Sequence, residues 1–422
     1  MNSLSVLFVV ALACGLLIQL WLARRQMVHV AAHRGAVPAA FSGQIPPEAH
    51  QKAADYTLAK TRFGQLELVA GAVWLLLWTV GGGLNLLDEA WHNLGLGPIW
   101  TGVGFILSTF TLMAVLDLPF SIYRTFVIEQ RFGFNRTTPK LFITDLIKQV
   151  MLMFALGIPL VTLILWLMDA SGDLWWLYVW LVWMSFSLIM MWAYPAFIAP
   201  LFNKFKELQD ADLALRIQQL LQKCGFTSKG IFVMDGSTRS GHGNAYFTGL
   251  GSNKRIVFFD TLMETLKPAE IEAVLAHELG HFKRKHIQKR MIVMAFISLL
   301  GLALLGWLIG QPWFYSGLGI EHPSLHAALV LFLIGVPVFT FFLQPVMTYF
   351  SRKHEFEADD FAAQYSDPRA LIEALVKLYK ENASTLTPDP LYSAFHYSHP
   401  PASARVAHLW SKTHEKTVGV PA

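Results

Sequence analysis

The sequence predicts a mainly α-helical, polytopic integral membrane protein with a small cytoplasmic α+β unit. Composition is the first indication, because 54% of the 422 residues are hydrophobic and only 15% are charged, whereas soluble domains carry about 25% charged residues. The second indication is a set of seven apolar segments, each close to the roughly 20 residues that a membrane-spanning helix requires. The third is a long polar stretch after the fifth segment, with room for helices and short strands.

The first apolar segment is expected to be a retained membrane helix and not a signal peptide. No lysine or arginine precedes it, and its positive residues, Arg24 and Arg25, follow it. Seven buried core helices of a soluble protein would be the alternative, but so many long uncharged runs argue against it. The expected membrane spans are residues 4–23, 66–87, 99–121, 149–168, 174–196, 291–311 and 325–348.

Positive charge alternates between the loops that join these spans. The loops after the first, third, fifth and seventh spans contain lysine and arginine, whereas the loops after the second, fourth and sixth contain neither. By the positive-inside rule, the N-terminus lies outside and the C-terminus lies in the cytoplasm. The short outside loops favour a bacterial inner membrane, with the endoplasmic reticulum membrane as the alternative.

Charge and cysteine content limit the classes of function. The net charge of +4 reflects the bias of the cytoplasmic loops, so no nucleic-acid partner is expected. Of the two cysteines, Cys14 lies in an apolar segment and Cys224 in a predicted soluble helix. Neither a disulfide framework nor a cysteine zinc site is therefore expected.

The polar stretch after the fifth span is expected to fold as a small α+β unit. An amphipathic helix over 213–224 ends at Gly225. Short strands are expected at 230–235 and 255–260. Between them, 244–249 suits an edge strand.

A further helix of this unit carries the most informative motif of the chain. It begins at Pro268, since proline suits the first turn, and an apolar face continues through Leu279 at helical spacing. His277 and His281 lie four residues apart, and therefore on one face, where both can bind one zinc ion. Glu278 is suited to act as general base towards an activated water. An accidental match in a charged helical turn is the alternative.

A catalytic zinc site needs a third protein ligand, with the fourth position left for water. Glu355 is the best candidate, because Asp359 follows four residues later on the same helical face. Asp359 can then accept a hydrogen bond from a ligating histidine, as residues behind zinc ligands commonly do. A solvated acidic face that includes Glu357 and Asp360 is the alternative.

These motifs resemble the M48 family of membrane zinc peptidases, and more closely its Ste24-type branch, the CAAX prenyl protease 1 group. The resemblance covers most of the chain, from about the second apolar segment to the C-terminus. The run from Phe126 to Asn135 is the most discriminating part, since shorter M48 relatives are not expected to carry it. The similar segments are Thr125-Phe126-Val127-Ile128-Glu129 with Phe132-Gly133-Phe134-Asn135, Pro200-Leu201-Phe202-Asn203-Lys204, Asn244-Ala245-Tyr246-Phe247, and His399-Pro400-Pro401 with Arg405.

The resemblance implies further site residues. His399 and Arg405 would complete the catalytic machinery as donors to the oxyanion of the transition state; a fixed loop residue and a helix-face cation are the alternatives. Extended substrate would pair through backbone hydrogen bonds with the edge strand that contains Asn244, Ala245 and Tyr246, unless this is an ordinary exposed strand.

Three other polar residues have two possible settings. The resemblance implies a large chamber enclosed by the membrane helices, so Asp117 either faces that chamber or lies at a helix end near the membrane interface. His242 and His286 are expected at the surface or near the rim of the active site.

The predicted protein is an integral membrane zinc endopeptidase with one Zn²⁺ per chain and a zincin-like catalytic unit. Its partners are the lipid bilayer and a peptide or protein substrate. The resemblance implies cleavage near the C-terminus of prenylated CAAX proteins or of other membrane-associated peptides. A quality-control peptidase without prenyl specificity is one alternative, and a transporter or scaffold with a vestigial metal site is another.

The chain is accordingly divided into four parts. Residues 1–198 form the first five membrane helices with their loops, and residues 199–290 form the catalytic unit. Residues 291–348 form the last two membrane helices. Residues 349–422 form the cytoplasmic C-terminal part that completes the zinc site.

Overall fold

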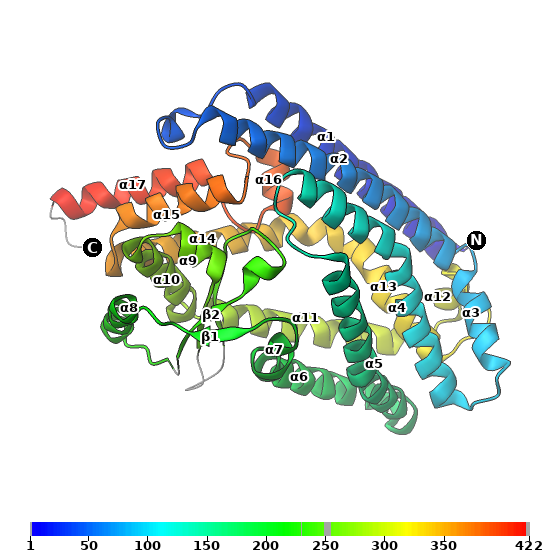
Figure 1. Ribbon diagram of the computed structural model, residues 1–422. Helices are drawn as coiled ribbons and strands as arrows, with labels where there is room; N and C mark the ends of the chain where they lie inside the picture. Colours follow the sequence, from blue (N-terminus) through cyan, green and yellow to red (C-terminus); the bar gives the residue numbers. More distant parts are fainter. Residues whose placement is uncertain (1, 229, 249–254, 419–422) are drawn as a thin grey trace.

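Long apolar helices extend from one side of a smaller α+β unit in the computed structural model, which describes residues 2–228, 230–248 and 255–418 (Figure 1). In this described part, six helical segments are long and apolar enough to cross a membrane, and one bent helix pair can supply a seventh. The predicted class of fold is therefore confirmed. These segments consist mainly of α1 (Ser3–His33), α2 (Pro47–Trp78), α3 (Gly83–His92), α4 (Pro98–Tyr123), α5 (Pro139–Ala170), α6 (Trp175–Ala193), α11 (His286–Leu308) and α13 (Leu325–Thr340).

The second predicted span, 66–87, falls on the bent helix pair. The axes of α2 and α3 differ by 48° across a short break. Gly82, at the N-cap of α3, has a φ of 79°, a left-handed conformation that glycine adopts without the steric cost borne by other residues. The predicted single span is thus a broken one.

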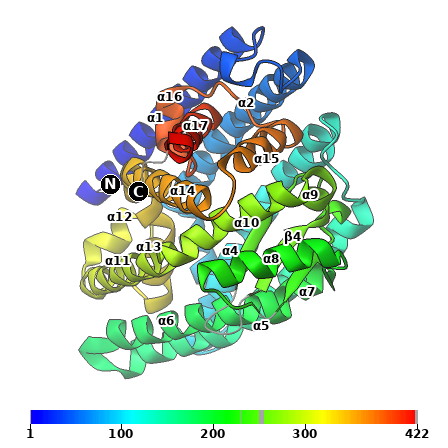
Figure 2. The same cartoon turned by 90° about the vertical axis from the view of Figure 1, so that its left-hand side faces the viewer.

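The membrane helices lie in pairs. α1 runs beside α2 along one border of the molecule, and α6 runs beside α11 along the opposite border (Figure 1, Figure 2). Apolar side chains of α4, α5 and α13 share one buried core with side chains of α1, α6 and α11, and this core includes Phe105, Leu165 and Leu331. Large apolar side chains on the outward faces are exposed, including Leu17, Ile189, Ile292 and Phe296, as expected for helices that face lipid.

A four-stranded sheet forms the β part of the smaller unit. Its order is β1-β2-β4-β3, with β2 parallel to β4 and the other neighbours antiparallel. β3 is therefore an edge strand, as predicted; the last residue of the predicted range, Gly249, lies outside the described residues. The strands are β1 (Phe205–Glu207), β2 (Ile231–Met234), β3 (Ala245–Thr248) and β4 (Arg255–Phe259).

The helices of the smaller unit come from two distant parts of the sequence. Side chains such as Ile217, Ile256, Leu279, Phe361 and Leu375 share one buried core, so the C-terminal helices pack directly onto the sheet unit. This packing brings the two halves of the predicted metal site together. The remaining helices are α7 (Ala199–Phe202), α8 (Ala211–Cys224), α9 (Asp260–Thr265), α10 (Pro268–Lys283), α12 (Pro312–Gly317), α14 (Gln344–Tyr365), α15 (Pro368–Glu381), α16 (Pro390–His396) and α17 (Ala402–Val418).

Candidate metal centre and active site

A glycine allows α10 to approach α14 closely. A Cβ atom at Gly280 would lie 3.0 Å from the Cα of Ala358 and 3.0 Å from the Cβ of Phe361. Any larger residue would therefore push the two helices apart, which explains a glycine at a position where it weakens the helix. This close approach sets the two histidines of α10 opposite Glu355 of α14.

His277, His281 and Glu355 converge on one point. Nε2 of His277 lies 3.2 Å from Nε2 of His281 and 3.4 Å from Oε2 of Glu355. Nε2 of His281 lies 3.3 Å from Oε1 of Glu355. His277 and Glu355 are buried and His281 is half-buried, so the three form a candidate metal-binding group at the edge of the protein interior.

The spacing of these atoms fits a tetrahedral metal ion. With bonds of about 2.0–2.1 Å, ligand atoms around such an ion are separated by about 3.3 Å, which the three observed separations match. Oε2 of Glu355 is buried without a hydrogen-bond partner among the described residues, so its lone pairs remain available. Two imidazoles and one carboxylate are a ligand set found in catalytic zinc sites, which keep a fourth position for water.

Asp359 and Arg405 support His277 from behind. Oδ1 of Asp359 lies 2.8 Å from Nδ1 of His277, and Asp359 is fully buried. Arg405 donates to both carboxylate oxygens of Asp359, and its Nη1 lies 3.6 Å from Oε2 of Glu355. Because its guanidinium is buried and engaged with these carboxylates, its contacts favour a positioning role for Arg405. The oxyanion role predicted for it stays a prediction.

The carboxylates of Asp359 and Glu355 stabilise positive charge at this centre. Burial and the nearby Arg405 lower the pKa of His277, but the hydrogen bonds to Asp359 and Glu355 outweigh them and raise that pKa to about 9. In the protein without metal, these carboxylates therefore stabilise a proton on His277. The same charges would stabilise a bound metal cation instead.

Glu278 faces a cavity of about 1290 Å³. Its side chain is half-buried, and within the described part of the chain its carboxylate is neither hydrogen-bonded nor ion-paired. An unengaged carboxylate beside the ligands, open to the cavity, has the position that a general base requires. Asp117 is exposed on α4 and does not line this cavity.

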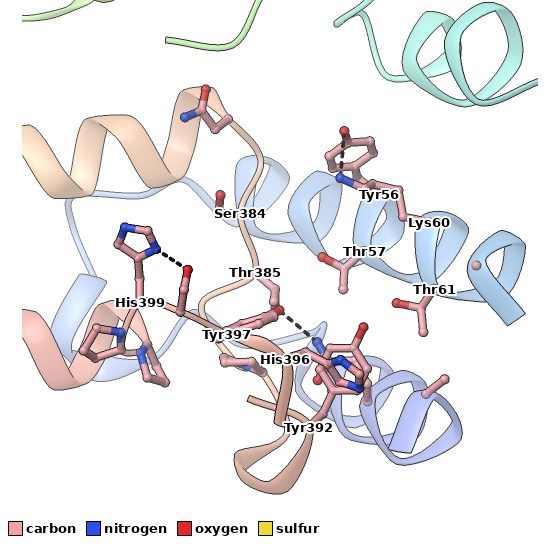
Figure 3. Close-up of a pocket in the computed structure, with 18 of the residues that line it drawn as sticks. Tyr56, Thr57, Lys60, Thr61, Ser384, Thr385, Tyr392, His396, Tyr397 and His399 are labelled. Atoms are coloured by element: carbon pink, nitrogen blue, oxygen red, sulfur yellow. Dashed lines mark hydrogen bonds between the residues drawn. The ribbon is translucent and has the colours of Figure 1, made fainter. Parts of the chain in front are cut away.

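His399 lies on the wall of the same cavity. Figure 3 shows it at one end of a wall that also contains Tyr392, His396 and Tyr397, with Tyr56 and Lys60 contributed by α2. Nε2 of His399 is 3.4 Å from Oε1 of Glu355, and its side chain is 63% exposed because it faces the cavity. Desolvation within the cavity lowers the pKa of His399, and Glu355 offsets part of this effect. A neutral imidazole at this position can donate a hydrogen bond into the cavity.

The predicted substrate-binding strand borders the cavity only in part. Asn244 and Ala245 line it, whereas Tyr246 does not. The ring of Tyr246 packs against Phe259, with its hydroxyl 3.9 Å from Sδ of Met234, so a contact of substrate with Tyr246 would involve its backbone.

Sequence reasoning missed two residues around the site. His286, expected at the surface or near the rim, is buried, and its Nδ1 lies 3.0 Å from Nδ1 of His281. Asn382, the C-cap of α15, accepts a hydrogen bond from the backbone N–H of Gly243 at 3.0 Å and donates to its carbonyl at 3.3 Å. The five-residue spacing from His281 to His286 could have indicated His286, whereas no local sequence pattern indicates Asn382.

A second cluster of possible ligands does not fit a metal ion. Asp88 and His92 of α3 lie beside His326 of α13. Nε2 of His326 is 2.6 Å from Oδ1 of Asp88, the length of a direct hydrogen bond, so no ion can lie between these two atoms. The described cluster is a buried hydrogen-bonded pair that joins the two helices.

Comparison with known proteins gives matches over nearly the whole chain. Residues 26–204 match the model of the CAAX prenyl protease N-terminal region with five membrane helices, and residues 207–413 match that of peptidase family M48. A CAAX prenyl protease 1 homolog of Arabidopsis thaliana is 38% identical, covering 88% of this chain and 89% of the relative. CAAX prenyl protease 1 of Saccharomyces cerevisiae is 34% identical, covering 88% of each. The crystal structure of S. mikatae Ste24p superimposes with a TM-score of 0.91 and 30% identity, covering 97% of this chain and 99% of that one.

Fold, ligand set and cavity together define a membrane-integral metalloendopeptidase. The matches agree, and they argue against a transporter or scaffold with a vestigial site. The chain belongs to peptidase family M48, in its Ste24-type branch.

Proposed function

We propose that this enzyme is a zinc-dependent endopeptidase that cleaves membrane-associated CAAX-type proteins near their C-terminus, prenylated ones included. The observation that carries the proposal is the position of the ligand group on the wall of the large cavity. The curated relatives are named CAAX prenyl protease 1 or its homologs, which supports this class of substrate.

The two ends of the cavity suit a substrate with two kinds of chemistry. Near the ligands, the lining offers the edge of β3, Glu278 and His399 to a peptide. Further along, α1, α2 and α13 line it with apolar side chains, including Leu12, Leu16, Leu68, Leu75 and Val338. A prenyl chain would bury apolar surface there, worth roughly 25 cal/mol per Å² removed from water.

The ligand set favours zinc. His277, His281 and Glu355 would hold the ion, as in other zinc sites with two histidines and one glutamate. When bound, zinc supplies Lewis acidity that polarises the scissile carbonyl and acidifies a water molecule. Glu278 accepts a proton from the attacking water and returns it to the leaving amine. His399 donates a hydrogen bond to the oxygen on which negative charge develops.

Membrane orientation is part of the proposal. The alternation of loop charges supports an outside N-terminus and a cytoplasmic active site. A bacterial inner membrane is favoured by the short outside loops, and the endoplasmic reticulum membrane is the alternative.

The test compares matched peptides with the purified protein in liposomes. One peptide ends in a farnesylated Cys-aliphatic-aliphatic-X sequence, and its control has the same sequence without the lipid. We expect about one zinc per chain and cleavage of the lipidated peptide after the modified cysteine, measured by mass spectrometry. Equal cleavage of both peptides at scattered positions would instead favour the quality-control alternative, and absence of zinc would refute the metal assignment.

A further inference from the structure

We propose that His286, held by Glu357 and His354, positions the ligand His281 in the tautomer and ring orientation that metal binding requires. The inference rests on the proposed zinc site and adds residues that lie behind it. It gives the second ligand histidine a support that is distinct from the Asp359–Arg405 pair behind His277.

A continuous chain of contacts leads away from the site. Nδ1 of His281 lies 3.0 Å from Nδ1 of His286, and Nε2 of His286 lies 2.9 Å from Oε2 of Glu357. His286 is 5% exposed, so bulk water does not compete for either of its ring nitrogens. Both nitrogens of this buried ring are therefore engaged, one towards a metal ligand and one towards a carboxylate.

The direction of each hydrogen bond follows from which atoms carry a proton. An ionised carboxylate only accepts, so Nε2 of His286 carries a proton and donates it to Glu357. In the neutral ring, Nδ1 of His286 is then an acceptor, and Nδ1 of His281 must be the donor. This leaves the lone pair of His281 on Nε2, the atom that lies 3.3 Å from Oε1 of Glu355. The contacts from Glu357 through His286 to His281 thus select the tautomer of His281 that can bind the metal.

The link between α10 and α11 is built to bring His286 back to the site. Lys285 has a φ of 58°, a left-handed conformation that is strained for a non-glycine residue. This residue turns the chain within two positions of the end of α10, so that the first residue of α11 lies against His281. The strained link is explained by the contact that it creates.

Two residues of α14 fix the ring of His286. His354 and Glu357 are three residues apart and share one face of the helix. The ring of His354 stacks on that of His286 with centroids 4.0 Å apart and an angle of 13° between the planes. α14 therefore supports both ligand histidines, His277 directly through Asp359 and His281 through His286.

The experiment measures zinc affinity by competition with a fluorescent chelator, on the full chain in detergent. We expect His286→Leu and Glu357→Ala each to weaken zinc binding by about 10–100-fold, the range typical of residues behind metal ligands. His286→Gln should recover much of the affinity, since a carboxamide can accept from His281 and donate to Glu357. The absorption spectrum of the Co²⁺-loaded protein should change in the first two variants, because the ligand geometry changes.

The chain offers a closely matched control pair, with Asp360 on α14 and His408 on α17. Asp360 also pairs with a histidine, His408, at 2.8 Å, but that pair does not touch a ligand. Asp360→Ala and His408→Leu should therefore keep the affinity of the unsubstituted protein. The melting temperature of each chelated variant shows whether it is folded, and the partly exposed Glu357 keeps the test valid if His286→Leu unfolds.

The outcomes separate this inference from the proposed function. The zinc site stands if the unsubstituted protein binds zinc and His281→Ala abolishes that binding. The inference is overturned if, in addition, His286→Leu and Glu357→Ala bind zinc as tightly as the control variants do. If the unsubstituted protein binds no zinc, the proposed function itself fails.

Discussion

Nδ1 of His277 lies 2.8 Å from Oδ1 of Asp359, and both oxygens of the same carboxylate accept hydrogen bonds from the buried Arg405. The nitrogen of His277 that faces away from the ligand group is thus fixed by a buried contact with a carboxylate. We expect Asp359→Asn to lower zinc affinity by about 10–100-fold. It should also destabilise the metal-free protein by about 3 kcal/mol, because the buried Arg405 loses one of its two counter-charges and keeps only Glu355.

Two measurements check this prediction: chelator competition for zinc affinity, and thermal unfolding of the chelated protein in detergent. Asp360→Asn is the control, since Asp360 is partly exposed and pairs with His408 away from the ligands. An Asp359→Asn protein that melts at the unsubstituted temperature with unchanged affinity would contradict both effects.

Glu278→Gln should keep zinc and lose peptidase activity. Glu278 faces the cavity beside the ligands without belonging to the group that converges on the metal position. Removing a general base costs about 10²–10⁴-fold in rate. Metal content and kcat are measured for this variant and for His281→Ala, which should lose the metal. If both variants lose zinc equally, Glu278 is a ligand and the assignment of roles is wrong.

Glu355→Ala should weaken zinc binding by more than the roughly 100-fold that marks the upper range for residues behind ligands. Glu355 supplies the carboxylate oxygens that lie 3.4 Å and 3.3 Å from Nε2 of His277 and His281. Glu357 is not a neutral comparison, since it contacts His286 at 2.9 Å, so Asp360→Ala serves as the control. Equal zinc retention in the Glu355 and Asp360 variants would refute the choice of third ligand.

The approach of His277 and His281 to Glu355 depends on how α10 packs against α14, and neither the break at Gly82 nor strand β1 was predicted. The sequence was sufficient to predict the apolar segments, strands β2, β3 and β4, and the position of His277 and His281 on one helical face. Those features depend on apolar length and on helical spacing, which are local properties. Local spacing could not predict the environment of Glu357. A solvated acidic face was one interpretation, but the turn at Lys285 places His286 against this helical face, where it contacts Glu357.

Strand β3 is a second case in which local sequence does not predict the surroundings of a residue. Its strand character follows from local sequence, but the residue that fixes it, Asn382, lies 139 positions from Gly243. No periodicity connects a helix C-cap with a distant strand, because only the shared core of the two segments brings them together. The position of Arg405 behind Asp359 likewise depends on how α17 packs against α14.

Asn382→Ala should raise KM for a peptide substrate by about 10-fold and change kcat less. Asn382 makes two hydrogen bonds to the backbone of Gly243, directly before the cavity-lining Asn244 and Ala245. Their loss would cost about 1 kcal/mol each and loosen the strand that is proposed to pair with substrate. Steady-state kinetics of Asn382→Ala and of Glu381→Ala, an exposed neighbour, make the comparison. A KM equal to that of the control would exclude a positioning role for Asn382.

His399→Ala should lower kcat by roughly 10²–10³-fold, the scale of a single oxyanion donor, and change KM far less. The reason is that His399 faces the cavity with Nε2 3.4 Å from Oε1 of Glu355, next to the proposed zinc site. A donor aimed at a developing charge contributes little to the ground state. Zinc content should stay constant, since His277, His281 and Glu355 are the three proposed ligands.

The control for this variant is His396→Ala, from the same wall of the cavity. His396 packs against Tyr392 and lacks the His-Pro-Pro context of His399. Values of kcat, KM and zinc content are measured for both variants in liposomes. Loss of zinc in His399→Ala would make His399 a ligand and reopen the assignment of Glu355. Full activity would reduce His399 to a loop residue fixed by Pro400 and Pro401, because a transition-state donor cannot be removed without a loss in kcat.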